Sequence, residues 1–133
     1  GLVAITPAAG FVSVSASIFI GVIASFVSNL AVTWKSKSTL DDTLDVFPCH
    51  GLGGIVGMIM TGIFASNVGL IYGRTETFFV HIIALFIVSV FTFGGSYLLY
   101  KITDFLIPIR VTNEQEELGL DLSQHEESVQ QRF

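Results

Sequence analysis

His50 is the residue best suited to chemistry, because it is an ionisable side chain within a long apolar segment. A neutral imidazole offers one hydrogen-bond donor and one acceptor, and it can exchange protons near neutral pH. Ionisable residues inside membrane spans are functional candidates by default. Two interpretations stay open at this point. His50 either lies on a path through a membrane, or it bonds to a neighbouring helix and is structural.

Small residues follow His50 at helical spacing. If this segment is a helix, Gly54, Gly57 and Thr61 share one face with His50. A small and weakly polar face is expected to point into protein or a cavity rather than toward lipid. We expect Gly53, Gly54, Gly57 and Thr61 to serve helix packing, because small residues let helices approach closely in a membrane.

Two acidic residues precede the same segment. Asp45 is expected to be the N-cap, with its carboxylate accepting amide hydrogens of the first helical turn. Pro48 then falls in that turn, where a missing amide hydrogen costs little. We expect Asp42 and Asp45 to hold the helix in place rather than bind a substrate, and Thr6 is a further candidate for such support.

The sequence offers no pattern typical of an enzyme. It contains no nucleophile–base arrangement, phosphate-binding loop or dense cluster of metal ligands. Cys49 and His50 are adjacent, but two ligands are too few for a metal site. We therefore expect no enzymatic activity, no metal and no cofactor.

Three segments are long and apolar enough to cross a bilayer, which requires about 20 residues of helix. They cover approximately residues 10–34, 46–66 and 78–107. Backbone groups in lipid must bond within their own segment, so these spans are expected to be helices. The predicted fold class is an all-α polytopic membrane protein, with a transmembrane region at 1–110 and a tail at 111–133.

The first and third spans carry further candidates. Ser17, Gly21 and Ser25 recur at helical spacing in the first span, and we expect them to pack against another helix. His81 lies near one end of the third span. We expect it to make a helix contact or to lie at the membrane interface.

Charge is unevenly distributed along the chain. Residues 1–110 hold five acidic and five basic side chains, whereas residues 111–133 hold six acidic and one basic, so the net charge of −5 belongs to the tail. Nothing here is basic enough to predict nucleic-acid binding. Lysines and arginines follow the first and third spans, which by the positive-inside rule places the first loop and the C-terminal tail in the cytoplasm.

Several blocks of the sequence resemble the ammonium transporter (Amt/Rh) family. The block Gly1-Leu-Val-Ala-Ile-Thr-Pro-Ala-Ala-Gly-Phe-Val12 resembles the region before the family's ninth helix. The block Asp42-Thr-Leu-Asp-Val-Phe-Pro-Cys-His50-Gly-Leu-Gly-Gly-Ile-Val-Gly57 resembles the start of its tenth. Met60-Thr-Gly-Ile-Phe-Ala65 continues the match. The chain departs from the pattern at Pro48-Cys49, where many members have Gly-Val.

The resemblance implies an eleven-helix subunit that assembles as a homotrimer in the cytoplasmic (inner) membrane. This chain would supply the C-terminal portion, namely helices nine to eleven and the cytoplasmic tail. His50 would be the second member of a twin-histidine pair lining the pore. The first member would belong to the missing N-terminal half of the subunit.

The tail also resembles the family's cytoplasmic end, over residues 110–125. That likeness implies coupling between subunits and gating by a cytosolic PII signalling protein, although Glu126 replaces the usual glycine. The tail residues assigned to this role are Arg110, Glu114, Glu117, Gly119, Asp121 and His125. From the residues alone, the tail is either a disordered solubilising end or a segment that packs against the membrane domain.

The function implied is conduction of ammonium or ammonia across the membrane. A histidine suits this path, because a bare cation is expensive in a low-dielectric channel and neutral ammonia is not. Two alternatives remain. The same scaffold could be an ammonium sensor that signals through its tail, or this chain could be a truncated subunit that does not conduct.

Overall fold

The computed structural model describes residues 1–127, and within them every regular element is a helix or a helical turn. Three of the helices are long, and the others are short segments before or after them. In chain order the elements are α1 (Leu2–Ile5), η1 (Thr6–Ala8), α2 (Val14–Lys35), η2 (Phe47–Gly51), α3 (Leu52–Phe64), η3 (Leu70–Tyr72), α4 (Glu76–Leu106), α5 (Asn113–Leu118) and α6 (Leu120–His125).

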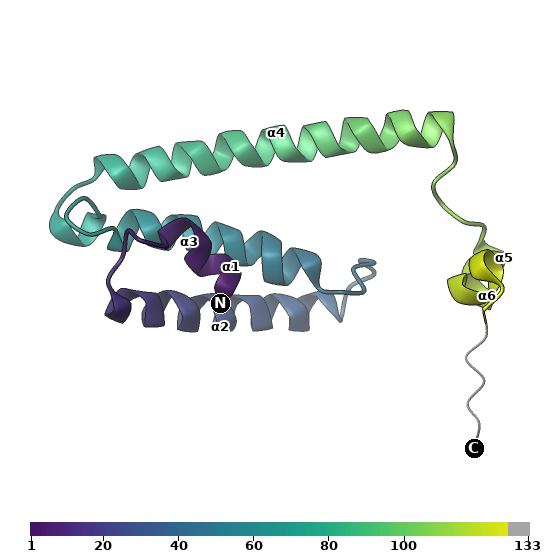
Figure 1. Ribbon diagram of the computed structural model, residues 1–133, viewed down its shortest axis with the longest axis horizontal. Helices are drawn as coiled ribbons and strands as arrows, with labels where there is room; N and C mark the ends of the chain where they lie inside the picture. The colour runs from purple at the N-terminus through teal and green to yellow at the C-terminus, as the bar shows by residue number, and fades with distance from the viewer. Residues whose placement is uncertain (128–133) are drawn as a thin grey trace, which may run out of the picture. The chain divides into compact units, whose positions relative to one another are not determined.

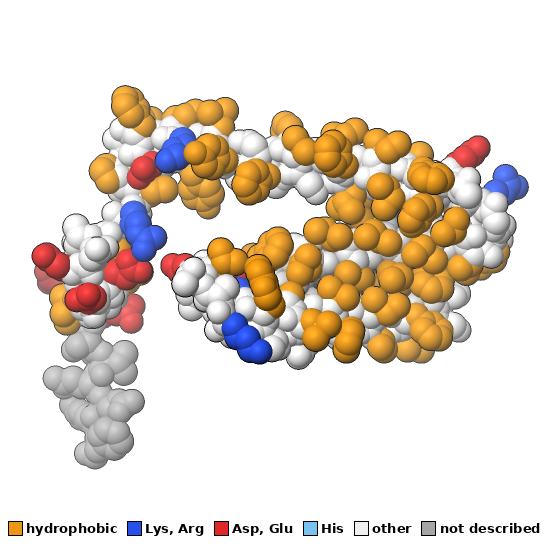
Figure 2. Space-filling view, turned by 180° about the vertical axis from the view of Figure 1, so that it is seen from behind, with side chains coloured by type: hydrophobic (Ala, Val, Ile, Leu, Met, Phe, Trp, Pro, Cys, Tyr) orange, Lys and Arg blue, Asp and Glu red, His pale blue; other side chains and the backbone are white. Residues whose placement is uncertain are grey.

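Among residues 1–127, three stretches are long and apolar enough to cross a membrane: α2, the continuous helix Phe47–Phe64 and α4. Figure 2 shows apolar side chains covering these helices, with charged side chains gathered near helix ends and on the tail. No residue of α4 is buried within the chain. The predicted class is confirmed: the described residues are those of an all-α polytopic membrane protein, with three helices long and apolar enough to span a membrane.

The chain divides into two compact units, Gly1–Val90 and Phe91–Phe133. In the first unit α1, α2 and α3 contact one another, and α2 and α3 lie side by side (Figure 1). The short α1 inserts against both of the longer helices. Its own four residues form one turn, so its position depends on this packing rather than on intrinsic helix stability.

Three alanines and one isoleucine make up the core of the first unit. Ala4 and Ala8 come from the N-terminal turns, and Ile20 and Ala24 come from α2. Gly57 of α3 lies so close to α1 that any side chain at this position would overlap the backbone carbonyl of Ala4. Close approach of this kind replaces the hydrophobic effect as the basis of helix association in lipid.

In the second unit, two short helices follow α4. Thr112 caps α5: its hydroxyl accepts a hydrogen bond from the Gln115 amide at 3.3 Å, while the Gln115 side chain accepts one from the Thr112 amide at 3.0 Å. Gly119 separates α5 from α6 with φ +93°, in the region that favours glycine. The Ser123 hydroxyl donates to the Gln115 carbonyl and ties α6 to α5. The described part of the tail is therefore helical.

Candidate functional site

His50 lies in a turn that is wound more widely than the helix it begins. Phe47–Gly51 form a π-helical turn, in which the Leu52 amide donates to the carbonyl of Phe47, five residues earlier. Pro48 is at the start of this turn and is fully buried. Wide turns of this type frequently occur at functional sites, because they displace a side chain from the regular helical register.

The His50 side chain is exposed on this unit. Among residues 1–127, no side chain or backbone group is hydrogen-bonded to its ring. A structural role would therefore need a hydrogen-bonding partner from outside the described residues, and so would a role in a histidine pair.

The carboxylate that caps this turn belongs to Asp42. Its Oδ1 accepts a hydrogen bond from the Val46 amide at 2.8 Å, and its Oδ2 accepts one from the Phe47 amide at 2.9 Å. The pKa of the Asp42 carboxyl lies below its ordinary value, chiefly because of the bond from Phe47, then that from Val46, with a smaller contribution from the positive charge of Lys35.

The prediction that Asp45 is the N-cap was therefore wrong. Asp45 has φ +52°, a left-handed conformation that Asp tolerates better than most residues. Its carboxylate pairs with Lys35, with Oδ1 lying 2.6 Å from the lysine Nζ. Asp42 is close enough to reach both free amides at once, and Asp45 anchors the turn to α2 instead.

Lys35 joins the two acidic positions. Besides pairing with Asp45, its ammonium donates a hydrogen bond to the backbone carbonyl of Asp42 at 2.7 Å. Lys35 is the last residue of α2, so this bond and the ion pair connect the end of α2 to the start of the next span. An open pocket of about 610 Å³ lies beside this junction, with Leu40, Phe47 and Gly51 among its lining residues.

The small residues that follow His50 do not all have the same environment. Gly53, Gly57 and Thr61 are buried, and the Thr61 hydroxyl donates to the Gly57 carbonyl at 2.7 Å. Gly54 faces open space, with no atom within 4 Å of the position that a side-chain methyl would occupy. His50 is exposed, and it lies in the wide turn rather than in the regular helix α3.

The candidate packing residues of α2 lie outside its buried face. Ser17 and Ser25 donate to the carbonyls of Val14 and Gly21, and Gly21 itself has open space around it. The buried residues of α2 are Ala16, Ile20 and Ala24. Sequence reasoning missed this stripe, although spacing of four residues between small and apolar side chains could have indicated it.

Thr6 and His81 bond within their own helical segments. The Thr6 hydroxyl donates to the Leu2 carbonyl at 2.8 Å. His81 Nδ1 lies 2.8 Å from the Thr77 carbonyl, and since a carbonyl only accepts, Nδ1 carries the hydrogen. A methyl placed at Gly62 would be 3.6 Å from His81 Cβ, so His81 also packs near α3.

In the tail, Arg110 pairs with Glu116, whose carboxylate lies 2.9 Å from its Nη2. Glu114 and Glu116 lie in the first turn of α5 and Asp121 in that of α6, where acidic side chains complement the helix dipole. Glu117 is exposed, and His125 ends α6. Glu116 and the Thr112–Gln115 capping box were missed, although Thr-Asn-Glu-Gln carries the spacing typical of that box.

Within the described residues, no cluster of three or more His, Cys, Asp or Glu side chains could hold a metal ion. The polar groups near His50 instead hold the backbone in place. The His50 imidazole is exposed at the start of an apolar helix, in a turn whose first amides are capped by Asp42.

Comparison with known proteins assigns the chain to a family. Residues 1–130 match the sequence profile of the Ammonium Transporter Family. The chain is 44% identical over 139 residues to a Bacillus subtilis protein named ammonium transporter, covering 98% of this chain and 34% of that protein. It is 39% identical over 132 residues to ammonium transporter Amt1 of Archaeoglobus fulgidus, covering 96% of this chain and 34% of that protein. The chain thus spans about a third of the length of these relatives.

Proposed function

Because the chain belongs to the ammonium transporter family, a family of transporters rather than enzymes, we propose that it forms part of a subunit that conducts ammonium or ammonia across a membrane. The observation that carries this proposal is the family match over nearly the whole chain, together with an exposed imidazole at the start of an apolar helix. His50 is the residue to which we assign the path.

The physical basis is the cost of moving a charge through lipid. A bare ammonium ion loses its hydration in a narrow apolar pore, whereas neutral ammonia does not carry that penalty. An imidazole can accept a hydrogen bond from one nitrogenous species and donate one to the next. It also exchanges protons near neutral pH, so it can take part in deprotonating the cation.

His50 needs a second imidazole to form the proposed pair. We propose that it comes from a part of the subunit outside this chain, within an eleven-helix fold assembled as a homotrimer. Support comes from the length of the relatives, of which this chain covers about a third. Small residues of α2 with open space beside them, such as Gly21, offer a face on which those other helices would pack.

We propose that α2, the Phe47–Phe64 helix and α4 cross the cytoplasmic membrane with the C-terminus on the cytoplasmic side. The support is the position of the basic residues: Lys35 and Lys37 lie at the end of α2 and just after it, and Lys101 and Arg110 lie at the end of α4 and beyond it. The helical tail then lies in the cytoplasm, where a PII signalling protein or a neighbouring subunit would contact its acidic side chains.

The test is an electrical recording from the full-length protein. Currents on solid-supported membranes after an ammonium jump are compared for the wild type, His50→Ala and the matched control His81→Ala. We expect His50→Ala to lose the current or its selectivity for ammonium while the oligomer still forms. His81→Ala should retain both, because this ring bonds within its own helix.

The other outcomes decide between functions. An unchanged current in His50→Ala would remove His50 from the path. A wild type that binds ammonium without any flux, in membranes where a known transporter conducts, would favour the sensor or the non-conducting subunit.

A further inference from the structure

Lys35, the last residue of α2, reaches the loop that leads into the His50 turn. Its Nζ lies 2.6 Å from Asp45 Oδ1, and it also donates a hydrogen bond to the backbone carbonyl of Asp42 at 2.7 Å. One side chain therefore holds two points of the same loop. Because α2 is 22 residues long and packs against α3, it gives this loop a rigid support.

Backbone hydrogen bonds continue this connection as far as the residue beside His50. The Asp42 carbonyl that Lys35 binds also accepts the Asp45 amide at 3.1 Å. The Asp45 carbonyl in turn accepts the Cys49 amide at 3.0 Å. Cys49 directly precedes His50, so a movement of Asp45 reaches the imidazole through one hydrogen bond and one peptide unit.

The backbone of Asp45 makes the ion pair more than an added contact. Its φ of +52° lies in a region that residues other than glycine seldom occupy, and such a conformation persists where the surroundings enforce it. Asp45 Oδ1 is shielded from solvent, and Lys35 is its charged partner. Without Lys35 the carboxylate would turn toward water, because burying an unpaired charge is unfavourable. The left-handed turn would then be free to relax.

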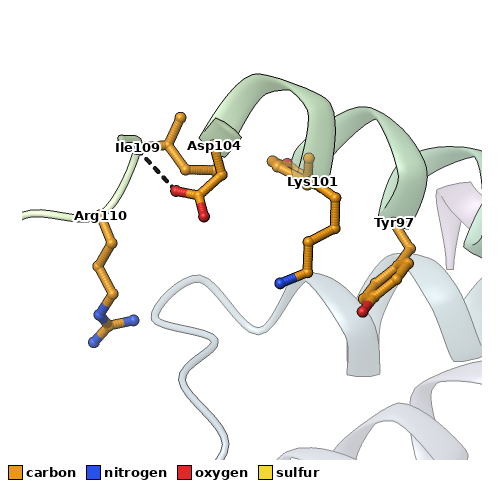
Figure 3. Close-up of a pocket in the computed structure, with 6 residues that line it drawn as sticks. Tyr97, Lys101, Asp104, Ile109 and Arg110 are labelled. Atoms are coloured by element: carbon orange, nitrogen blue, oxygen red, sulfur yellow. Dashed lines mark hydrogen bonds between the residues drawn. The ribbon is translucent and has the colours of Figure 1, made fainter. Parts of the chain in front are cut away.

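The lysine near the end of α4 has a different environment. Lys101 lies 5.8 Å from the centre of the Tyr97 ring, and it is in neither ion pair found among residues 1–127. The nearby Asp104 accepts a hydrogen bond from the Ile109 amide at 3.2 Å, so it holds the chain after its own helix (Figure 3). A positive charge near a helix end is enough to orient a membrane span. The two contacts of Lys35 go beyond that requirement.

We propose that Lys35 is a positioning residue of the ammonium path, which sets the place of the His50 imidazole by holding Asp45 and Asp42. This inference rests on the proposed function, in which His50 lies on the path. Groups that act on a bound molecule need to be placed to within about 0.5 Å, and their supporting residues supply that precision. Lys35 acts on the imidazole through the backbone rather than by touching it.

The first measurement is solid-state NMR of the full-length protein in lipid bilayers, with isotopically labelled histidine. The His50 ring signals are those that disappear in His50→Ala, and the His81 signals are assigned in the same way. Lys35→Met should shift or split the His50 signals and leave those of His81 in place, because His81 bonds within its own helix. A general loss of stability would not move the signals of one histidine alone.

The second measurement is the current per oligomer on solid-supported membranes after a jump to saturating ammonium. Lys35→Met should lower it about tenfold, since a displacement of roughly 1 Å lowers the rate at a reacting site by up to about 100-fold. Lys35→Arg keeps the charge and offers several donors, so it should restore the current and the His50 signals. Lys37→Met removes a lysine that is in neither ion pair, and it should change neither measurement.

A second variant tests the same contact if Lys35→Met does not assemble. Asp45→Asn removes the ion pair from its other side, and asparagine tolerates the left-handed conformation better than most residues. This milder change should also shift the His50 signals and leave those of His81 unchanged.

Three results would each overturn the role of Lys35: His50 signals that do not move in Lys35→Met, an equal change in Lys37→Met, or a current in Lys35→Arg as low as in Lys35→Met. The current of His50→Ala separates this inference from the proposed function. If His50→Ala loses the current and Lys35→Met keeps it, only the positioning role fails. If His50→Ala keeps the current, the proposed function fails, and the positioning role in the path fails with it.

Discussion

The Lys35 ammonium lies 2.6 Å from the Asp45 carboxylate, and this ion pair joins the last residue of α2 to a residue two positions before the turn that carries His50. Asp45 reaches Lys35 from a left-handed backbone conformation, with φ +52°. The pair therefore fixes both a side-chain contact and an uncommon turn of the chain. The orientation of the His50 turn relative to α2 depends on this connection.

Removing the ion pair should loosen that connection. Lys35→Met and Asp45→Asn are each expected to lower the thermal unfolding temperature of the full-length protein in detergent. Because both changes break the same contact, the unfolding temperature of the double variant should fall by less than the sum of the two single decreases. The effects should shrink in high salt, since both side chains are partly exposed and their attraction is screened.

Lys37→Met is the matched control, because Lys37 lies two residues after Lys35 and is in neither ion pair found among residues 1–127. If Lys37→Met lowered the unfolding temperature as much as Lys35→Met, positive charge in this region, rather than the Lys35–Asp45 contact, would be the source of the stability. Strict additivity in the double variant would also count against the contact.

Asp42 should make stability depend on acid pH. Its carboxyl pKa is lowered in the folded chain, chiefly by the hydrogen bonds from the Phe47 and Val46 amides. The stabilisation is then fully present above the ordinary carboxyl pKa of 3.8 and is lost as pH falls through the lower folded value. We expect the difference in unfolding temperature between the wild type and Asp42→Ala to be constant above about pH 5 and to shrink below pH 4.

The variant Asp41→Ala, which changes the neighbouring residue, is the control. The Asp41 carboxylate makes no hydrogen bond to the helix start among the described residues. The unfolding temperatures of the wild type and Asp41→Ala should therefore differ little at any pH. If the unfolding temperature of Asp42→Ala stays equally far below that of the wild type down to the most acid pH tested, the ionised Asp42 cap is not the origin of the difference in stability.

The three membrane-spanning helices could be predicted from sequence, because apolar length is a property of the segment alone. The cap could not be assigned correctly in the same way. Asp42 and Asp45 both precede the helix at plausible distances, and the choice depends on the left-handed turn at Asp45 and on the reach of Lys35. Helical periodicity contains no information on either.

The environment around His50 shows a similar limit. Regular helical spacing placed His50, Gly54, Gly57 and Thr61 on one face, but the wide turn at Phe47–Gly51 alters the register before α3 begins. Packing then selects Gly53, Gly57 and Thr61 as buried residues. Because α1 supplies the surface that buries Gly57, this selection depends on a contact between distant parts of the sequence.

The tail should lose helix when its capping box is removed. Thr112→Ala deletes the hydroxyl that accepts the Gln115 amide, a change that costs about 1 kcal/mol at a typical N-cap. The α5 amides are expected to exchange with deuterium faster in Thr112→Ala than in the wild type. Thr112→Ser keeps the hydroxyl and should exchange at the wild-type rate, whereas equal exchange in all three proteins would exclude a role for the cap.

Two glycines of α3 should respond to alanine in opposite directions. A methyl at Gly57 would overlap the Ala4 carbonyl, so Gly57→Ala must push α1 away from α3 and should destabilise the protein by about 1–3 kcal/mol. Gly54 has open space within this chain, and replacing an interior helical glycine by alanine stabilises a helix by about 1 kcal/mol. Thermal unfolding of full-length Gly57→Ala and Gly54→Ala measures both changes in stability. A loss in Gly54→Ala as large as that in Gly57→Ala would mean that another helix of the subunit packs on Gly54. That result would place Gly54 in an interface with the rest of the subunit, beside the turn that carries His50.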